Sequence, residues 1–123
     1  MKTDALPLKG CRVLEISTAW AGPMLGRILC DLGAEVVKLE SLDAIDNWRG
    51  AVKGDDRKRY PAGEPGSKPY NRNAWFNTQN MGKFSVGVDL KSPLARSTIE
   101  ELVKSSDALI CNFASGALKR MNL

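Results

Sequence analysis

The 123-residue sequence contains no histidine, and this absence narrows the chemistry that the chain can perform. A Ser-His-Asp triad, a Cys-His pair and the commonest zinc ligand sets all need an imidazole. Proton transfer within the chain would have to use Asp, Glu, Lys, Tyr or Cys. The three cysteines, Cys11, Cys30 and Cys111, lie in or beside apolar runs at unrelated spacings, which favours buried thiols over a disulfide framework or a metal site. We therefore expect no bound metal.

Long apolar runs are also missing. No stretch approaches the roughly 18 apolar residues of a membrane span, and residues 1–7 lack the apolar core of a signal peptide. These features predict a cytoplasmic protein without a membrane partner. The net charge is only +4, and its densest part, residues 55–59, mixes acidic with basic side chains. This balance suits a small anionic ligand better than a nucleic acid, which calls for a basic face with interleaved aromatic residues.

Four apolar runs that alternate with helical patterns indicate the fold class. The runs cover residues 12–17, 35–40, 85–90 and 108–113. Strands that alternate with helices predict an α/β fold, with a parallel sheet and right-handed crossovers. A hydrophobic content of 43% in 123 residues is enough for one modest core, so we expect a single domain over residues 1–123.

Two helices are expected between these strands. In the first, Pro23 suits the opening turn and Gly33 the C-terminal cap. Its apolar residues recur at helical spacing and are Met24, Leu25, Ile28, Leu29 and Leu32. In the second, Ser92 can cap the helix and Pro93 can take the first helical position. Its apolar stripe is formed by Leu94, Ile99, Leu102 and Val103.

Residues 41–79 do not fit the alternation of strands and helices. Loops longer than about 12 to 15 residues in compact domains are usually functional or disordered. Complete disorder is disfavoured by the aromatic residues of the segment, which are Trp48, Tyr60, Tyr70, Trp75 and Phe76. We expect a short helix over residues 73–79, with the rest of this long loop covering a ligand or docking on another part of the protein.

The first strand, first helix and second strand together read as the first half of a nucleotide-binding βαβ unit. The Gly-x-Gly-x-x-Gly fingerprint of a dinucleotide site is absent, since the turn reads Ser17 to Pro23 without it. Trp20 stands where a backbone would have to approach a pyrophosphate, and Pro23 lacks an amide proton. Glu40 can still hold a ribose hydroxyl. Classical NAD binding is therefore disfavoured, and a generic α/β scaffold remains the main alternative.

Five blocks of sequence resemble the N-terminal part of the family III CoA-transferases, the group that includes formyl-CoA transferase, carnitine CoA-transferase and α-methylacyl-CoA racemase. The blocks are residues 7–15, 21–23, 31–40, 82–91 and 111–121. The resemblance implies a Rossmann-like sheet with flanking helices that binds coenzyme A in place of NAD. It also implies that this segment is an incomplete domain of a larger, interlocked homodimer.

The same resemblance implies a set of CoA-binding residues. In it Lys83 and Arg120 face phosphates, Asn112 and Phe113 line the nucleotide site, and Trp20 lies beside the acyl thioester. The full set is Trp20, Ala21, Ser41, Asn80, Met81, Gly82, Lys83, Asn112, Phe113, Ala114 and Arg120. Without the resemblance, Lys83 fits an exposed loop lysine, Phe113 a core aromatic and Arg120 a cation near a helix C-terminus.

Two further features of the family bear on function. Formyl-CoA transferases carry a glutamine at the position of Trp20, so formyl and oxalyl groups are disfavoured, and Trp48 can close over the acyl end. The resemblance implies CoA transfer from an acyl-CoA to a carboxylic acid through an aspartyl anhydride and an aspartyl-CoA thioester. That aspartate lies beyond Leu123, so no catalytic residue is assigned here. An acyl-CoA racemase of the same family and a stand-alone, non-catalytic CoA-binding module remain alternatives.

Overall fold

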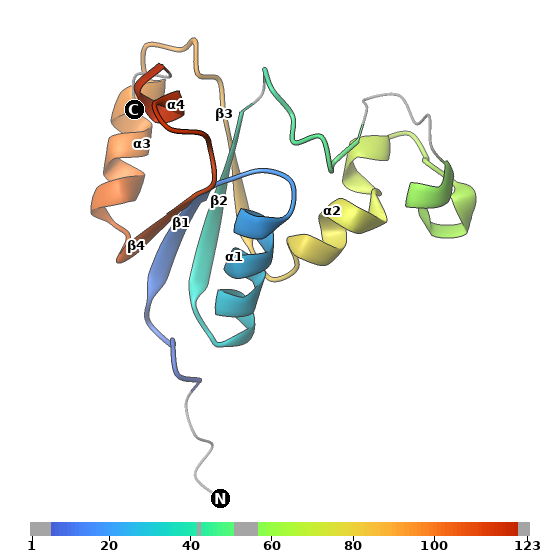
Figure 1. Cartoon of the computed structure of the whole chain (residues 1–123), viewed down its shortest axis with the longest axis horizontal. Coiled ribbons are helices and arrows are strands. Elements are labelled where there is room, and N and C mark those ends of the chain that lie inside the picture. The colour runs from blue at the N-terminus through green and yellow to red at the C-terminus, as the bar shows by residue number, and fades with distance from the viewer. Residues whose placement is uncertain (1–5, 42, 51–56, 121–123) are drawn as a thin grey trace, which may run out of the picture.

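The core of the protein is a four-stranded sheet, seen in a computed structural model that describes residues 6–41, 43–50 and 57–120 (Figure 1). Its strands are β1 (Arg12–Ile16), β2 (Glu35–Ser41), β3 (Phe84–Val88) and β4 (Ala108–Cys111). They lie in the order β3-β2-β1-β4, and each neighbouring pair is parallel. The predicted α/β fold with a parallel sheet is therefore confirmed.

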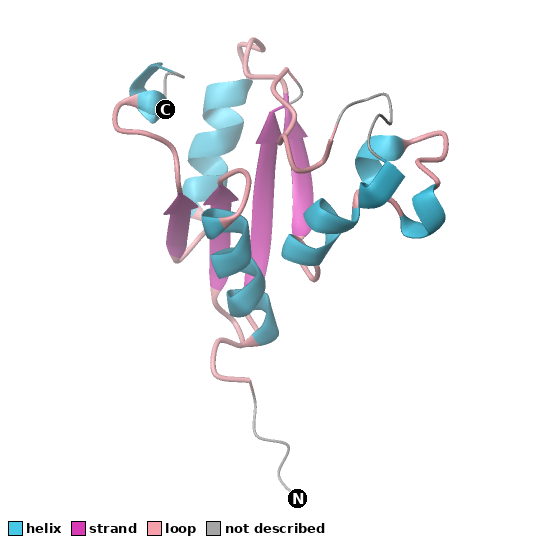
Figure 2. Ribbon diagram, turned by 45° about the vertical axis from the view of Figure 1, so that its right-hand side comes forward, coloured by secondary structure: helices cyan, strands magenta, loops and turns pink. Residues whose placement is uncertain are grey.

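Two helices cover opposite faces of the sheet, α1 (Ala21–Asp31) on one and α3 (Ala95–Lys104) on the other (Figure 2). Because successive strand residues point to opposite faces, each strand contributes to two separate cores. On the α3 side, Leu14 packs with Ile99 of α3 in one buried cluster. On the α1 side, Val13 packs with Val36, and Leu29 of α1 closes over them.

The apolar stripe of α1 faces away from the sheet. The residues that α1 buries are Gly22, Pro23 and Gly26. Leu29 packs against the sheet core, but the other four apolar side chains are between 40% and 47% exposed, namely Met24, Leu25, Ile28 and Leu32. The predicted helix is present. The residues that face the sheet are small because charged side chains lie beneath the helix.

The ends of the helices follow the sequence signals only in part. Gly33 follows α1 with a φ of +100°, and its amide donates to the Cys30 carbonyl, as expected of a C-terminal glycine. The prediction that the second helix begins at Pro93 is wrong, because α3 begins at Ala95. The Ser92 hydroxyl accepts from the Leu94 amide at 3.3 Å, so this serine closes a turn ahead of the helix and does not cap it. Leu94 is consequently 70% exposed and does not join the stripe.

The expectation that all three cysteines are buried is wrong for Cys111, which is exposed, whereas Cys11 and Cys30 are partly buried. The reason is the position of β4 at the edge of the sheet, where Ile110 is the only buried residue of the strand. All three thiols are free.

The long segment after β2 contains short helical pieces that lie beside the α1 face (Figure 1). They are η1 (Arg57–Arg59), η2 (Pro61–Gly63), η3 (Pro69–Asn71) and α2 (Ala74–Gln79). The predicted short helix is α2, and Asn73 caps it by accepting from the amides of Trp75 and Phe76. A last short helix, α4 (Ala117–Arg120), follows β4. Residues 55 and 56 of the predicted basic run lie outside the described residues. None of the described helices is long and apolar enough to cross a membrane.

Candidate functional site

The turn between β1 and α1 is held from two sides by side chains distant in sequence. Thr18 donates its amide to Asn112 Oδ1 at 3.1 Å and accepts from Asn112 Nδ2 at 2.8 Å. The next amide, that of Ala19, donates to both carboxylate oxygens of Asp46, at 3.2 and 3.1 Å. Ala19 has a φ of +62°, a left-handed conformation that L-residues other than glycine rarely adopt. The contacts thus hold a strained turn at the carboxyl end of β1, where open parallel sheets bind ligands.

Directly under α1 lies a buried charge cluster, formed by Glu15, Lys38, Asp46 and Lys83. Glu15 is fully buried, and its Oε1 accepts from Lys38 Nζ at 2.9 Å and from the Ser17 hydroxyl at 2.7 Å. Its Oε2 lies 2.7 Å from Lys83 Nζ. Lys38 also donates to the Ser17 carbonyl and lies 3.8 Å from Asp46. Two ammonium groups therefore balance two carboxylates in the interior, as buried charges require.

The Lys83 amine has three oxygen partners inside this cluster. Besides the ion pair with Glu15, its Nζ donates to the Pro23 carbonyl at 2.7 Å and to Asn80 Oδ1 at 2.9 Å. An ammonium group has three protons, and its side chain is only 2% exposed. Burial lowers the pKa of Lys83, although the Glu15 carboxylate offsets part of this effect. The amine that the resemblance assigns to a phosphate thus faces inward.

The small residues of α1 make room for the cluster. A Cβ added to Gly26 would lie 2.1 Å from Glu15 Oε2 and 3.1 Å from the Lys83 amine. A Cβ on Gly22 would lie 2.4 Å from Ser17 Cβ and 3.2 Å from the side chain of Asn112. Real Cβ atoms do not approach other atoms so closely. Both positions therefore require glycine, because α1 lies so close to the side chains beneath it.

Glu40, the acidic residue proposed for a ribose hydroxyl, is engaged by another side chain. Arg49 binds it through two hydrogen bonds of 2.6 and 2.7 Å, a forked geometry typical of strong guanidinium–carboxylate pairs. Ser85 donates to the same carboxylate at 2.6 Å. Burial by itself would raise the pKa of Glu40, but the hydrogen bonds from Arg49 and Ser85 outweigh it and lower the pKa. Arg49 also donates to the Tyr70 carbonyl, so this pair fastens the long segment to the sheet.

A small cavity lies at the carboxyl edge of the sheet. Its walls include Ile16, Ser41, Val88 and Phe113, each at or just past the end of a different strand. Its volume is about 50 Å³, well below the roughly 300 to 1,000 Å³ of ligand pockets. Of the predicted CoA-binding residues, Ser41 and Phe113 meet here, and Phe113 also packs against the α3-side core.

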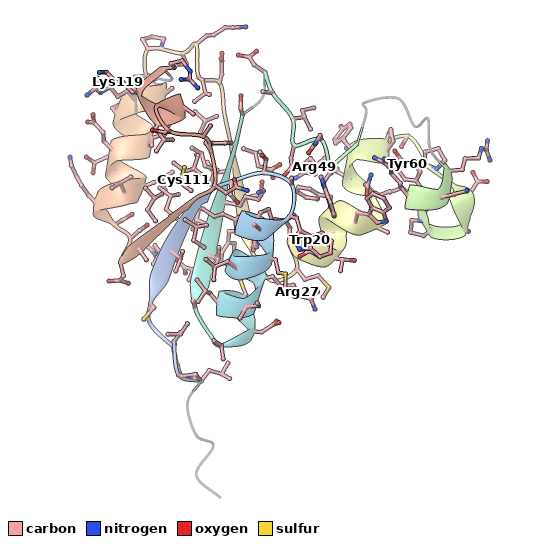
Figure 3. All side chains as sticks on the ribbon, viewed as in Figure 1. Trp20, Arg27, Arg49, Tyr60, Cys111 and Lys119 are labelled. Carbon is pink, nitrogen blue, oxygen red and sulfur yellow. The ribbon has the colours of Figure 1, made fainter. Side chains whose placement is uncertain are left out.

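A larger hollow opens between α1 and α2, and we call it the tryptophan hollow. Its lining residues are Trp20, Trp48, Trp75, Thr78 and Gln79, and its volume is about 370 Å³. The rings of Trp20 and Trp48 meet edge to face with centroids 5.0 Å apart, and those of Trp48 and Trp75 lie 5.3 Å apart. Figure 3 shows Trp20 at the start of α1 on the side facing α2. Trp48 thus lies against Trp20, whereas the part of Trp75 was not expected from the sequence.

The remaining residues of the predicted site fall on either side of α1. Asn80, Met81, Gly82 and Lys83 form the turn between α2 and β3, in which Asn80 donates to the Phe76 carbonyl. Met81 is 53% exposed, and Gly82 has a φ of +78°. Ala114 follows β4 and is exposed, as is Arg120 in α4. In Figure 1, α4 lies beside α3, at some distance from the turn between α2 and β3.

These features define a Rossmann-like α/β fold with a reinforced turn after its first strand, since β3-β2-β1-β4 is the order of the first four strands of the Rossmann sheet. The chain belongs to CoA-transferase family III, whose model matches residues 8–123. It is similar to a succinate–glutarate CoA-transferase of Agrobacterium fabrum, with 33% identity over 95% of this chain and 28% of the relative. It is also similar to a succinyl-CoA–D-citramalate CoA-transferase of Chloroflexus aurantiacus, with 34% identity over 95% of this chain and 26% of the relative.

The fold is shared with a crystal structure of a CAIB/BAIF family protein from Brucella suis. That structure superposes with a TM-score of 0.73 at 34% identity, and the match covers 97% of this chain and 29% of the other. The chain therefore spans between a quarter and a third of the length of these three relatives.

Proposed function

We propose that this chain is the N-terminal, CoA-binding part of an enzyme that transfers coenzyme A between an acyl-CoA thioester and a free carboxylic acid. The observation that carries the proposal is that two of the predicted residues bond to the backbone at the start of α1. Asn112 bonds to Thr18 just before the helix, and Lys83 bonds to Pro23 within it. Trp20 and Ala21 lie between these two contacts in the chain. A long, thin ligand crossing this end of α1 would meet the exposed residues Trp20, Ala21 and Asn112.

The residues take different roles in this proposal. Asn112 and Asp46 hold the strained turn on which Trp20 and Ala21 are presented to the thioester. Arg120 is exposed and supplies a cation for a phosphate. Lys83 supports the site from below, because its buried amine already has an ion pair with Glu15 and hydrogen bonds to Pro23 and Asn80. We therefore propose that Lys83 stabilises the buried charge cluster under α1 and does not contact a phosphate directly.

The proposed chemistry needs a carboxylate nucleophile supplied by a part of the protein beyond residue 123. Attack of that aspartate on the acyl carbon breaks the carbon–sulfur bond, releases the CoA thiolate and leaves a mixed anhydride. The thiolate then attacks the aspartyl carbonyl, which gives an aspartyl-CoA thioester and frees the first acid. Glu15 and Asp46 do not suit this task, since cations and backbone amides already bind them.

The assembly and location of the whole protein are part of the same proposal. We propose a homodimer in the cytoplasm that takes acyl-CoA and carboxylic acids and has no nucleic-acid partner. The outward apolar stripe of α1 supports the presence of a further protein surface there, because exposed apolar patches of this kind mark interaction sites. The stripe consists of Met24, Leu25, Ile28 and Leu32.

The test uses the full-length protein that contains this chain. Titration calorimetry with CoA should show binding, and Arg120→Ala should weaken it by about 1 to 3 kcal/mol if a charge-assisted phosphate contact is lost. Lys119→Ala, the neighbouring exposed lysine of α4, is the matched control and should bind like the wild type. Transfer of CoA from an acyl-CoA to a second acid is then measured directly. Exchange of an acyl α-proton without any transfer would favour the racemase, and absence of CoA binding would refute the proposal.

A further inference from the structure

All three tryptophans of the chain line one hollow. Their rings form a continuous row, with neighbouring centroids 5.0 and 5.3 Å apart. Trp20 and Trp75, at the ends of the row, remain 51% and 48% exposed. Large aromatic surfaces gathered in a concave site and left accessible are typical of ligand pockets. The hollow therefore has the features of a ligand site, and the chemistry of its lining indicates the class of ligand.

Among the residues that the structure describes, none that lines the hollow is charged. Besides the three indoles the lining consists of Thr78 and Gln79. Two guanidinium groups are engaged at its margins: Arg59 stacks on Trp75 at 4.7 Å, and Arg27 donates to the Thr78 carbonyl at 2.9 Å. A ligand carboxylate placed among these residues would lose its water without gaining a cation from the lining, which is costly.

The spacing of the rings also disfavours a cationic ligand. A quaternary ammonium group binds between aromatic rings that stand apart and enclose it, whereas neighbouring rings here are in mutual contact. Arg59 already lies over the face of Trp75 and would repel a second cation. An apolar chain or an aromatic ring, by contrast, gains contact area along the whole row.

We propose that the tryptophan hollow binds the acyl group and selects an apolar acyl group, aliphatic or aromatic, over one that ends in a second carboxylate. The inference rests on the proposed function, because it takes Trp20 as lying beside the thioester. The volume of about 370 Å³ is within the range of pockets that enclose small organic ligands. Selection follows because apolar groups gain contact area in the hollow, whereas its described lining offers no positive charge to a distal carboxylate.

The experiment compares hexanoyl-CoA with succinyl-CoA as donors to one fixed acceptor acid in the full-length enzyme. The expected wild-type ratio of kcat/KM is at least about tenfold in favour of hexanoyl-CoA, the scale on which apolar pockets discriminate. Trp75→Ala removes one end of the row, so part of the contact surface for the acyl chain is lost. The ratio should then fall to about two or less. Thr78→Arg places a cation at the exposed rim and should raise kcat/KM for succinyl-CoA.

Leu94→Ala is the matched control, because Leu94 is an exposed apolar side chain at the start of α3, outside the hollow. It should keep the wild-type ratio. A wild-type ratio near one or in favour of succinyl-CoA overturns the inference, and so does an unchanged ratio in Trp75→Ala. CoA binding measured by calorimetry separates failure of this inference from failure of the proposed function. If CoA binds but the ratio is near one, this inference fails alone, whereas loss of CoA binding refutes the proposed function and the inference with it.

Discussion

The ammonium group of Lys83 lies 2.7 Å from Oε2 of Glu15, and the two side chains are only 2% and 0% exposed. This ion pair joins the turn before β3 to the centre of β1 beneath α1. Glu15 Oε1 also accepts from Lys38 and from the Ser17 hydroxyl, and the Lys83 amine also donates to the Pro23 carbonyl. The pair is therefore a structural element on which the geometry of the first α1 turn depends.

Removing one partner of this pair should be strongly destabilising. Lys83→Met leaves a buried carboxylate oxygen of Glu15 without its cation, and we expect the free energy of unfolding to fall by about 3 to 5 kcal/mol. Urea unfolding of the full-length protein measures the loss. Lys104→Met, which breaks the exposed pair with Glu101, is the control and should cost no more than about 1 kcal/mol. An unchanged urea midpoint together with weaker CoA binding would show instead that the Lys83 amine serves a phosphate.

Helix α1 lies so close to the buried charge cluster that no room is left for a side chain at Gly26. Gly26→Ala would ordinarily stabilise a helix by about 1 kcal/mol. Here the added Cβ would lie 2.1 Å from Glu15 Oε2, so we expect a net loss of about 2 kcal/mol or more. Thermal unfolding compares it with Ser97→Ala on the exposed face of α3, which should stay within about 0.5 kcal/mol. Stabilisation by Gly26→Ala would mean that α1 can move away from the sheet at little cost.

The link between β4 and the turn after β1 should matter more for ligand binding than for stability. Asn112→Ala removes both hydrogen bonds to Thr18, and Asn112 is itself exposed. We expect CoA affinity to fall by about 1 to 2 kcal/mol because the strained turn is no longer held. Calorimetric titration checks this, with Asn77→Ala as a control that breaks an exposed hydrogen bond to Asn71 elsewhere. Equal affinity in the wild type and Asn112→Ala would remove Asn112 from the site.

Acid sensitivity should follow from the Glu40–Arg49 pair. The folded protein holds the pKa of Glu40 below its ordinary value of 4.5. A carboxyl group of this kind contributes stability that is fully present above its unfolded pKa and is lost as the pH falls through the folded pKa. The urea midpoint should therefore decline below about pH 4.5, and this decline should be shallower in Glu40→Gln. Glu64→Gln, at an exposed position, should retain the wild-type slope, and identical slopes in all three proteins would contradict the prediction.

Much of the fold follows from local patterns, but the direction of the α1 stripe does not. Apolar runs and turn residues predict the strands and the helices because each signal lies within a few neighbouring residues. A periodic stripe shows that a helix has an apolar face, without showing whether the sheet or another surface covers it. Glu15 and Lys38 are the available clue, since each is a charged residue inside an apolar strand run. Their partner Lys83 lies too far along the chain for any local pattern to connect it.

The candidate site was predictable to a similar extent. The resemblance brings Trp20, Trp48 and Asn112 to attention, and the structure places Trp20 against Trp48. It gives no sign that Asn112 bonds to Thr18, because that contact joins residues 94 positions apart. Trp75 was missed for the same reason, because its ring contact with Trp48 joins residues 27 positions apart.

The gathering of all three tryptophans in one place also decides how this domain emits light. Indole emission depends on the water around each ring, and Trp20 and Trp75 remain about half exposed. With ring centroids 5.0 and 5.3 Å apart, excitation of one indole passes readily to its neighbours. The tryptophan fluorescence of residues 1–123 therefore originates from a single site, and its wavelength and intensity report on how much water reaches that site.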